Sequence, residues 1–158
     1  MTSLASGSLP RPMKRTEPIL AWRIWRLSSD PDRGLVEPLL ESCVYGDVWA
    51  PCEPFAADCG DHPRPVPACA CGIYAVTTRE TALEWARWAQ SALPHPIVIG
   101  QVQLWGRVLP HSAGYRAELA YPYELEVLAG GLLDEAGADR LGRMLRDAYL
   151  VDIAQRAA

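Results

Sequence analysis

A segment dense in proline and cysteine, residues 46–71, places the strongest constraint on how this chain of 158 residues folds. The segment contains four of the five cysteines and one of the three histidines. It shows neither the 3.6-residue period of a helix nor the alternation of a strand, and structureless loops of this length are uncommon inside compact domains. We therefore expect contacts other than a backbone hydrogen-bond ladder to hold it in place.

The spacing of thiols and imidazole within this segment predicts a metal site. Cys59 and His62 are close enough in sequence to bind one ion from a single turn, and Cys69 and Cys71 supply a second pair. Zinc prefers four sulfur or nitrogen ligands in a tetrahedron, so we expect a structural zinc at Cys59, His62, Cys69 and Cys71. Such a site returns about 10–16 kcal/mol, which offsets the entropy lost when a loop becomes ordered.

Three other interpretations of the cysteines stay open. They are free thiols or a disulfide, an iron–sulfur cluster in which Cys52 joins the set, and a catalytic zinc. The spacing does not match the ferredoxin or Rieske patterns, and four protein ligands leave no open position for a catalytic water. Cys43 is interpreted as an ordinary buried thiol.

The rest of the chain carries strand and helix patterns. Alternating apolar residues predict strands at 19–27, 72–77, 97–109, 115–121 and 123–128. One helix is expected between a capping box at Thr77 and Glu80 and the stop at Pro94, and another at about 134–153. Residues 28–38 are expected to form a turn.

Runs of strands with segregated helices predict an α+β fold. We expect a mostly antiparallel sheet, two main helices and a long Pro/Cys-rich metal-binding loop. Residues 1–17 are expected to be a disordered tail, and residues 18–158 a single α+β domain.

A polar set on neighbouring strands is the candidate ligand-binding face. Arg116 and Glu118 lie two residues apart, so their side chains point to the same face of a strand. If a helix covers that face they must pair or bind a polar group, and if water covers it they are simply solvated. A third interpretation is a phosphate or carboxylate site at Arg116, assisted by Arg23 or Arg107. The candidate residues of this face are Tyr74, Trp105, Arg107, Arg116 and Glu118.

The six tryptophans are interpreted mainly as core residues, including Trp85 and Trp88 at helical spacing. A platform that stacks on a base or another ring is the alternative.

Charge and hydropathy exclude several classes of protein. The 15 Lys and Arg residues against 19 Asp and Glu residues give a net charge of −4, which argues against a nucleic-acid partner. The chain lacks an apolar stretch of the ~20 residues that a bilayer requires, and its first residues lack the order of a signal peptide. We therefore expect a cytoplasmic protein with no membrane contact. The fingerprints of Rossmann dehydrogenases, P-loop NTPases, α/β-hydrolases and zincins are missing.

Two resemblances add to these expectations. The segments CACGIYAVT, VIGQVQLWGRVLPHSAGYRAELAYP and AWRIWRL resemble a group of uncharacterised, largely actinobacterial proteins. The order of GIYA, a helix rich in small residues and IVIGQVQLWG resembles the centre of poly-ADP-ribose-polymerase-like ADP-ribosyltransferases. That second resemblance implies NAD as a cofactor, a nicotinamide pocket lined by Gly72 to Ala75, and Glu118 as the catalytic glutamate.

The leading hypothesis is a small cytoplasmic binding or regulatory domain that is stabilised by zinc and takes an unknown small-molecule or protein ligand. An NAD-using enzyme of the ADP-ribosyltransferase type is the second hypothesis. A nucleic-acid or protein interaction module that uses tryptophan and arginine surfaces is the third.

Overall fold

The computed structural model describes residues 13–28, 38–59, 62 and 65–154. Residues 1–12 of the expected tail and most of the expected turn at 28–38 lie outside this part of the chain. The described residues form eight strands and two helices, which are β1 (Met13–Leu27), β2 (Leu40–Glu41), β3 (Val48–Trp49), β4 (Phe55–Ala56), β5 (Ile73–Val76), α1 (Arg79–Ala92), β6 (Ile97–His111), β7 (Gly114–Val127), α2 (Glu135–Tyr149) and β8 (Asp152–Ile153).

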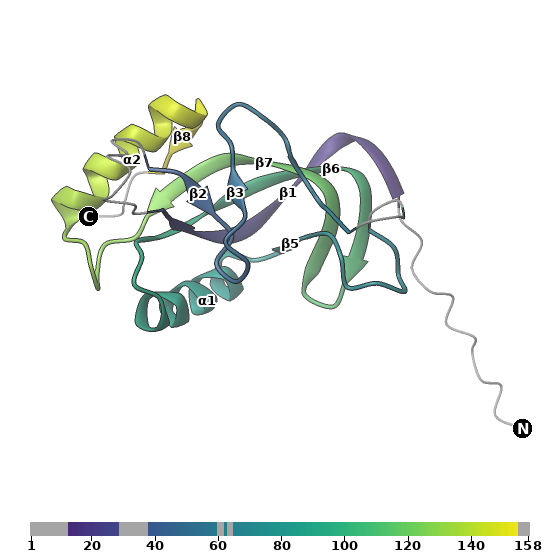
Figure 1. Cartoon of the computed structure of the whole chain (residues 1–158), viewed down its shortest axis with the longest axis horizontal. Coiled ribbons are helices and arrows are strands. Elements are labelled where there is room, and N and C mark those ends of the chain that lie inside the picture. Colours follow the sequence, from purple (N-terminus) through teal and green to yellow (C-terminus); the bar gives the residue numbers. More distant parts are fainter. Residues whose placement is uncertain (1–12, 29–37, 60–61, 63–64, 155–158) are drawn as a thin grey trace, which may run out of the picture.

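The strands form one sheet in which every pairing is antiparallel except that of β7 with β8. The predicted α+β fold with a mostly antiparallel sheet and a cysteine-rich loop is therefore confirmed. The long strands β1, β6 and β7 lie side by side, and Figure 1 shows α1 on one side of them and α2 with β8 near the opposite edge. No helix among the described residues is long and apolar enough to cross a membrane.

The sheet closes on itself through β5. This short strand pairs with β7 along its whole length and meets β1 at one position, where Trp22 lies opposite Val76. The series β1, β6, β7, β5 thus returns to β1. Beyond Trp22, the next partner of β1 on this side is β2, at Arg26 and Leu27. The sheet therefore opens between β5 and β2, and this opening positions the cleft described below.

The first half of the expected 46–71 loop is more regular than the sequence indicates. Val48 and Trp49 pair with β2, and Phe55 and Ala56 pair with β7. The prediction that no backbone ladder holds this segment was therefore wrong for its first half. Long-range pairing partners supply these ladders, and the local sequence pattern carries no signal of them.

Strand β1 begins at Met13, so it includes residues 13–17 of the expected tail. Its pairing with β6 shifts register between Arg15 and Ile19, where Pro18 lies and cannot donate a ladder hydrogen bond. The two strands expected at 115–121 and 123–128 are one strand, β7, that continues through Pro122. A second register shift lies opposite this proline, between Gln101 and Val102, and absorbs the irregularity.

Helix α1 uses small residues on its buried face. Ala82, Ala86 and Ala89 are fully buried, as the helical spacing predicted. The helix is capped by Thr78, one residue later than predicted, and its hydroxyl accepts a hydrogen bond from the Thr81 amide. Trp85 and Trp88 are about half exposed, so the interpretation of these two as core residues was wrong.

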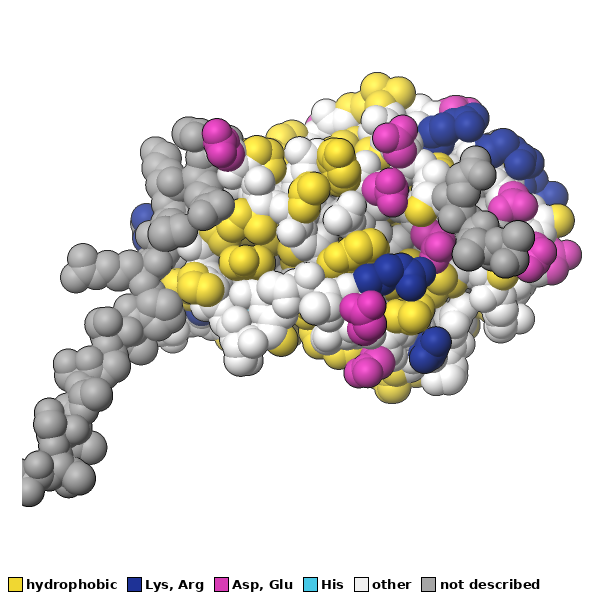
Figure 2. All heavy atoms as spheres, turned by 180° about the vertical axis from the view of Figure 1, so that it is seen from behind, with side chains coloured by type: hydrophobic (Ala, Val, Ile, Leu, Met, Phe, Trp, Pro, Cys, Tyr) yellow, Lys and Arg dark blue, Asp and Glu magenta, His cyan; other side chains and the backbone are white. Residues whose placement is uncertain are grey.

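Helix α2 ends at Tyr149, four residues before the predicted end. Its cap, Leu150, adopts a left-handed φ of 57°, which stops the helix, and the chain then returns to the sheet as β8. Charged side chains gather at the end of the molecule where α2 lies, as the rear view in Figure 2 shows.

The aromatic part of the core ties the β2–β3 hairpin to α2. Trp49 meets Trp25 edge to face at 5.4 Å between ring centroids and stacks on Phe55 at 4.4 Å. The buried Tyr149 hydroxyl accepts a hydrogen bond from the Leu40 amide at 2.9 Å and donates one to the Trp49 carbonyl at 2.5 Å. Burial raises the pKa of Tyr149 to about 12, so the hydroxyl stays protonated and keeps donating.

Candidate metal centre and adjacent cleft

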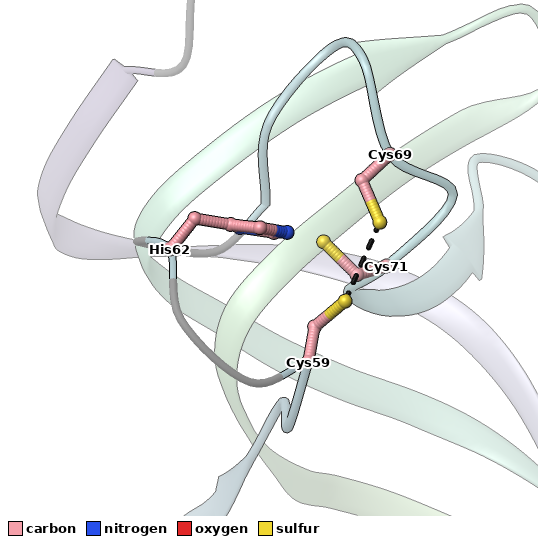
Figure 3. Close-up of side chains that lie close together, drawn as sticks. All are labelled: Cys59, His62, Cys69 and Cys71. Atoms are coloured by element: carbon pink, nitrogen blue, oxygen red, sulfur yellow. Dashed lines mark hydrogen bonds between the residues drawn. The ribbon is translucent and has the colours of Figure 1, made fainter.

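The four predicted zinc ligands come together in the structure. One ligand atom from each of Cys59, His62, Cys69 and Cys71 lies within 4.8 Å of the others. The Sγ atoms of Cys59 and Cys69 are 3.3 Å apart. Figure 3 shows the three sulfurs and the His62 ring pointing toward a common centre.

Strand β7 brings the two ends of the ligand-bearing segment together. Ala56 pairs with Leu119 on β7, and Ile73 pairs with Ala117 only two positions away. The chain between them must therefore form a closed loop, whatever its own sequence. Because Cys59 follows β4 closely and Cys71 precedes β5, ligands from both ends of the loop meet above the same stretch of β7.

Arg116 of β7 holds the loop from below. Its side chain is buried, and one terminal nitrogen donates to the carbonyl oxygens of Cys69 and Cys71, the latter at 2.9 Å. The other terminal nitrogen donates to the Val66 carbonyl at 3.3 Å. The guanidinium also lies 5.9 Å from the centre of the Tyr74 ring. Of the alternatives for Arg116, the structure agrees with a covered side chain that binds polar groups. These groups are backbone carbonyls of the loop.

The join between the loop and β5 requires glycine. Gly72 has a φ of +112°, a conformation that side-chain-bearing residues rarely adopt. A Cβ atom here would also lie 3.1 Å from the Cβ atoms of both Arg116 and Pro65. Gly72 thus lets the loop pack closely on β7 next to Arg116.

The thiols of the cluster differ in acidity. The hydrogen bond with the Cys59 side chain, followed by one with His62, lowers the pKa of Cys69 to about 6. The same contact with Cys69 raises the pKa of Cys59 to about 11. In the absence of a cation, Cys69 therefore carries the negative charge of this pair at neutral pH. The cluster is arranged to supply a thiolate, which is the form that binds metals.

The remaining cysteines lie outside this group. Cys52 is exposed, has a positive φ of 62°, and its amide donates to the Tyr121 hydroxyl at 2.9 Å. Cys43 is half-buried, and burial raises its pKa. Cys43 was interpreted as a buried thiol and is only half-buried, and Cys52 is not among the ligands that the structure brings together.

A cleft of about 1170 Å³ borders the metal centre. It lies where the sheet opens between β5 and β2. Residues 22–24 of β1 and 72–74 line it, together with residues 42–45, 47 and 48 of the β2–β3 hairpin. Trp85 and Trp88 of α1 add a further wall, and Cys59, Cys69 and Cys71 connect the cleft to the metal centre.

Arg23 bridges this opening. One terminal nitrogen donates to the Tyr74 carbonyl of β5 at 2.6 Å, and the other donates to the Ser42 hydroxyl at 3.1 Å. Its guanidinium lies over the Trp49 ring at 5.0 Å. Burial lowers the pKa of Arg23 to about 10, so it remains a cation at neutral pH. Arg23 was predicted only to assist an anion site at Arg116, because hydrogen-bond partners so distant in sequence leave no local signal.

The five residues of the predicted ligand face do not converge on one site. Tyr74 lines the cleft, and its hydroxyl donates to the Ala70 carbonyl at 2.6 Å. The Glu118 carboxylate accepts a hydrogen bond from the Arg107 amide at 3.0 Å, within the bulge of β6 around Gly106. The other four candidates are not among the described residues that line the cleft. They are Trp105, Arg107, Arg116 and Glu118. The roles assigned to these residues stay predictions.

The residues that the ADP-ribosyltransferase resemblance assigns to a nicotinamide pocket do not all line the cleft. Gly72, Ile73 and Tyr74 line the cleft, whereas Ala75 is buried and Glu118 takes part in the bulge. Comparisons of the chain with protein families, curated proteins and solved structures find no match. NAD binding and catalysis by Glu118 stay predictions.

Proposed function

We propose that this chain is a zinc-stabilised binding domain in which one structural zinc ion is held by Cys59, His62, Cys69 and Cys71. The observation that carries the proposal is the convergence of one imidazole and three thiols, whose ligand atoms lie within 4.8 Å of one another. In a tetrahedral site with Zn–S bonds of about 2.3 Å, neighbouring sulfurs are about 3.8 Å apart. The Cys59 and Cys69 sulfurs, 3.3 Å apart, need to separate only slightly to admit the ion.

Ligand chemistry supports zinc over harder cations. Thiolate and imidazole ligands suit zinc, whereas magnesium and calcium prefer oxygen. Four protein ligands complete a tetrahedron and leave no site for a reactive water, which supports a structural role. Reduced thiols of this kind persist in a reducing compartment, which supports a cytoplasmic location.

The buried cation behind the loop gives independent support. A divalent zinc with three thiolates and a neutral imidazole carries a net charge of −1. The Arg116 guanidinium donates to the carbonyl groups of two of the ligands, Cys69 and Cys71, and thus lies close to that charge. A buried arginine is stabilised by such a neighbour, and the anionic centre is stabilised in turn.

The test is metal analysis of protein purified without added metal or chelator. We expect one zinc per chain by plasma mass spectrometry, and at least a tenfold faster loss of zinc to a chromogenic chelator in Cys69→Ser. Cys52→Ser is the matched control, because Cys52 is an exposed cysteine outside the group, and it should retain zinc like the native protein. Protein with neither zinc nor another metal, or a Cys69→Ser variant that keeps its zinc unchanged, would refute the proposal.

The cleft beside the metal centre supports the binding part of the proposal. It is lined by the metal loop (the ligand-bearing segment 59–71), by β1 and β5, and by α1, so the zinc would fix one of its walls. In this arrangement the ion does not contact substrate as a catalyst. It sets the shape of the surface that meets a ligand.

A further inference from the structure

The exposed apolar side chains of the described residues gather at the cleft. Ten large hydrophobic residues are exposed in this part of the chain, and six of them line it. Contiguous exposed apolar surface of this kind marks interaction sites, whereas scattered single residues do not. The six residues are Val44, Tyr45, Val48, Tyr74, Trp85 and Trp88.

Aromatic rings stand on several sides of the cleft. Trp85 and Trp88 lie three residues apart on α1 and therefore share one face of the helix. Tyr45 lies in the turn between β2 and β3, with 86% of its surface exposed, and Tyr74 lies on β5. The rings come from three separate elements around the cleft.

Acidic side chains outnumber basic ones among the described residues that line the cleft, with Asp47 and Asp58 against Arg23. Arg23 is the single cationic side chain among the described lining residues, and its terminal nitrogens already donate to Tyr74 and Ser42. Its Nε atom is shielded from solvent, so a ligand does not reach it. Asp47 is exposed at the rim, and three ligands of the proposed anionic zinc centre line the wall.

We propose that this cleft binds a basic side chain, arginine or lysine, presented by an extended segment of a partner protein. Aromatic rings attract a cation through their faces, and an acidic rim favours the same charge. The volume of about 1170 Å³ lies just above the ~300–1,000 Å³ typical of small-molecule sites and leaves room for an extended segment. The charge argument rests in part on the proposed zinc centre, and the aromatic lining does not.

The experiment uses three pentapeptides that differ only at the central position. Ac-Ala-Ala-X-Ala-Ala-amide, with X as arginine, citrulline or glutamate, is titrated into the zinc-loaded protein and followed by the indole N–H signals of a nitrogen-15 NMR spectrum. We expect the arginine peptide to shift the signals of Trp85 and Trp88 and to bind about three- to tenfold more tightly than citrulline, its uncharged counterpart. The glutamate peptide should bind more weakly still.

Variants locate the site. Trp88→Ala and Asp47→Asn should each weaken the arginine peptide by about two- to tenfold, because each removes one attraction for the cation. Tyr123→Ala is the matched control, since Tyr123 is an exposed aromatic residue that does not line the cleft. It should bind like the native protein. Thermal melting of each variant reports whether its fold is intact.

Three results would overturn the proposal. They are equal binding of the arginine and citrulline peptides, tighter binding of the glutamate peptide, and no shift of either indole signal at millimolar peptide. Zinc content is measured on the same samples, so failure of the metal proposal is recognised separately. Protein that lacks zinc but still distinguishes arginine from citrulline would support this inference while refuting the proposed function.

Discussion

Replacing Arg116 with methionine is the perturbation that most directly tests the proposed organisation of the metal loop. Methionine retains much of the side-chain volume but removes the guanidinium that donates to the carbonyl groups of Val66, Cys69 and Cys71. Hydrogen bonds from charged donors contribute about 1.5–3 kcal/mol each, and the carbonyl groups left behind regain water in part because the loop is half exposed. We therefore expect the free energy of unfolding to fall by about 3 kcal/mol.

The assay is thermal unfolding of the zinc-loaded protein followed by circular dichroism. For a chain of this length, a loss of about 3 kcal/mol lowers the melting temperature by about 6–12 °C. Zinc release to a chromogenic chelator should also accelerate, because the ligands Cys69 and Cys71 lose their anchor on β7. Arg116→Lys should fall in between, since an ammonium keeps the charge but not the planar fork that spans three carbonyl groups.

Arg143→Met is the matched control, because Arg143 is exposed on α2, and it should melt within about 1 °C of the native protein. The reasoning fails if Arg116→Met melts within about 2 °C of the native protein and releases zinc at the native rate. The loop would then be held without the guanidinium.

Three further predictions follow from particular contacts. In metal-free protein, iodoacetamide should modify Cys69 readily down to about pH 6 and much more slowly below it, because the thiolate is the reactive form and the pKa of Cys69 is about 6. Cys59, with a pKa of about 11, should react slowly at pH 7. Equal modification rates of the two cysteines, measured by peptide mass mapping, would contradict this prediction. Tyr149→Phe should lower the free energy of unfolding by about 1–3 kcal/mol in urea denaturation, because it removes both hydrogen bonds of a buried hydroxyl; an unchanged midpoint would argue against them. Glu118→Gln, which keeps an acceptor oxygen for the bulge, should cost less than Glu118→Ala, and the reverse order would show that the bulge does not depend on this contact.

The metal-ligand set was within reach of sequence analysis because it is local. Cys59 and Cys71 are separated by only 11 residues, so all four ligands fall within one short segment of the chain. The coordination chemistry of thiols and imidazole then restricts the possible roles. The core face of α1 was equally accessible, because the spacing of Ala82, Ala86 and Ala89 is the helical period itself.

The two tryptophans of α1 show where the helical pattern misleads. Trp85 and Trp88 flank the alanine stripe, and the pattern assigned them to the core with it. Small alanines let the helix approach the sheet closely, which leaves no depth for an indole beside them. How many faces of a helix are buried depends on the width of the sheet that it packs against. The sequence of the helix alone does not contain that information.

The amino-acid sequence by itself determined the α+β class, the course of β6 and the four candidate ligands, since these follow from residue types and from spacings of a few positions along the chain. Only the tertiary structure decided that β4 and β5 meet on β7, that Arg116 and Arg23 donate to carbonyl groups about 45–50 residues away, and that a cleft opens between β5 and β2. Strand pairing couples positions far apart in the chain, and the energy that selects it comes from the packing of all the elements together.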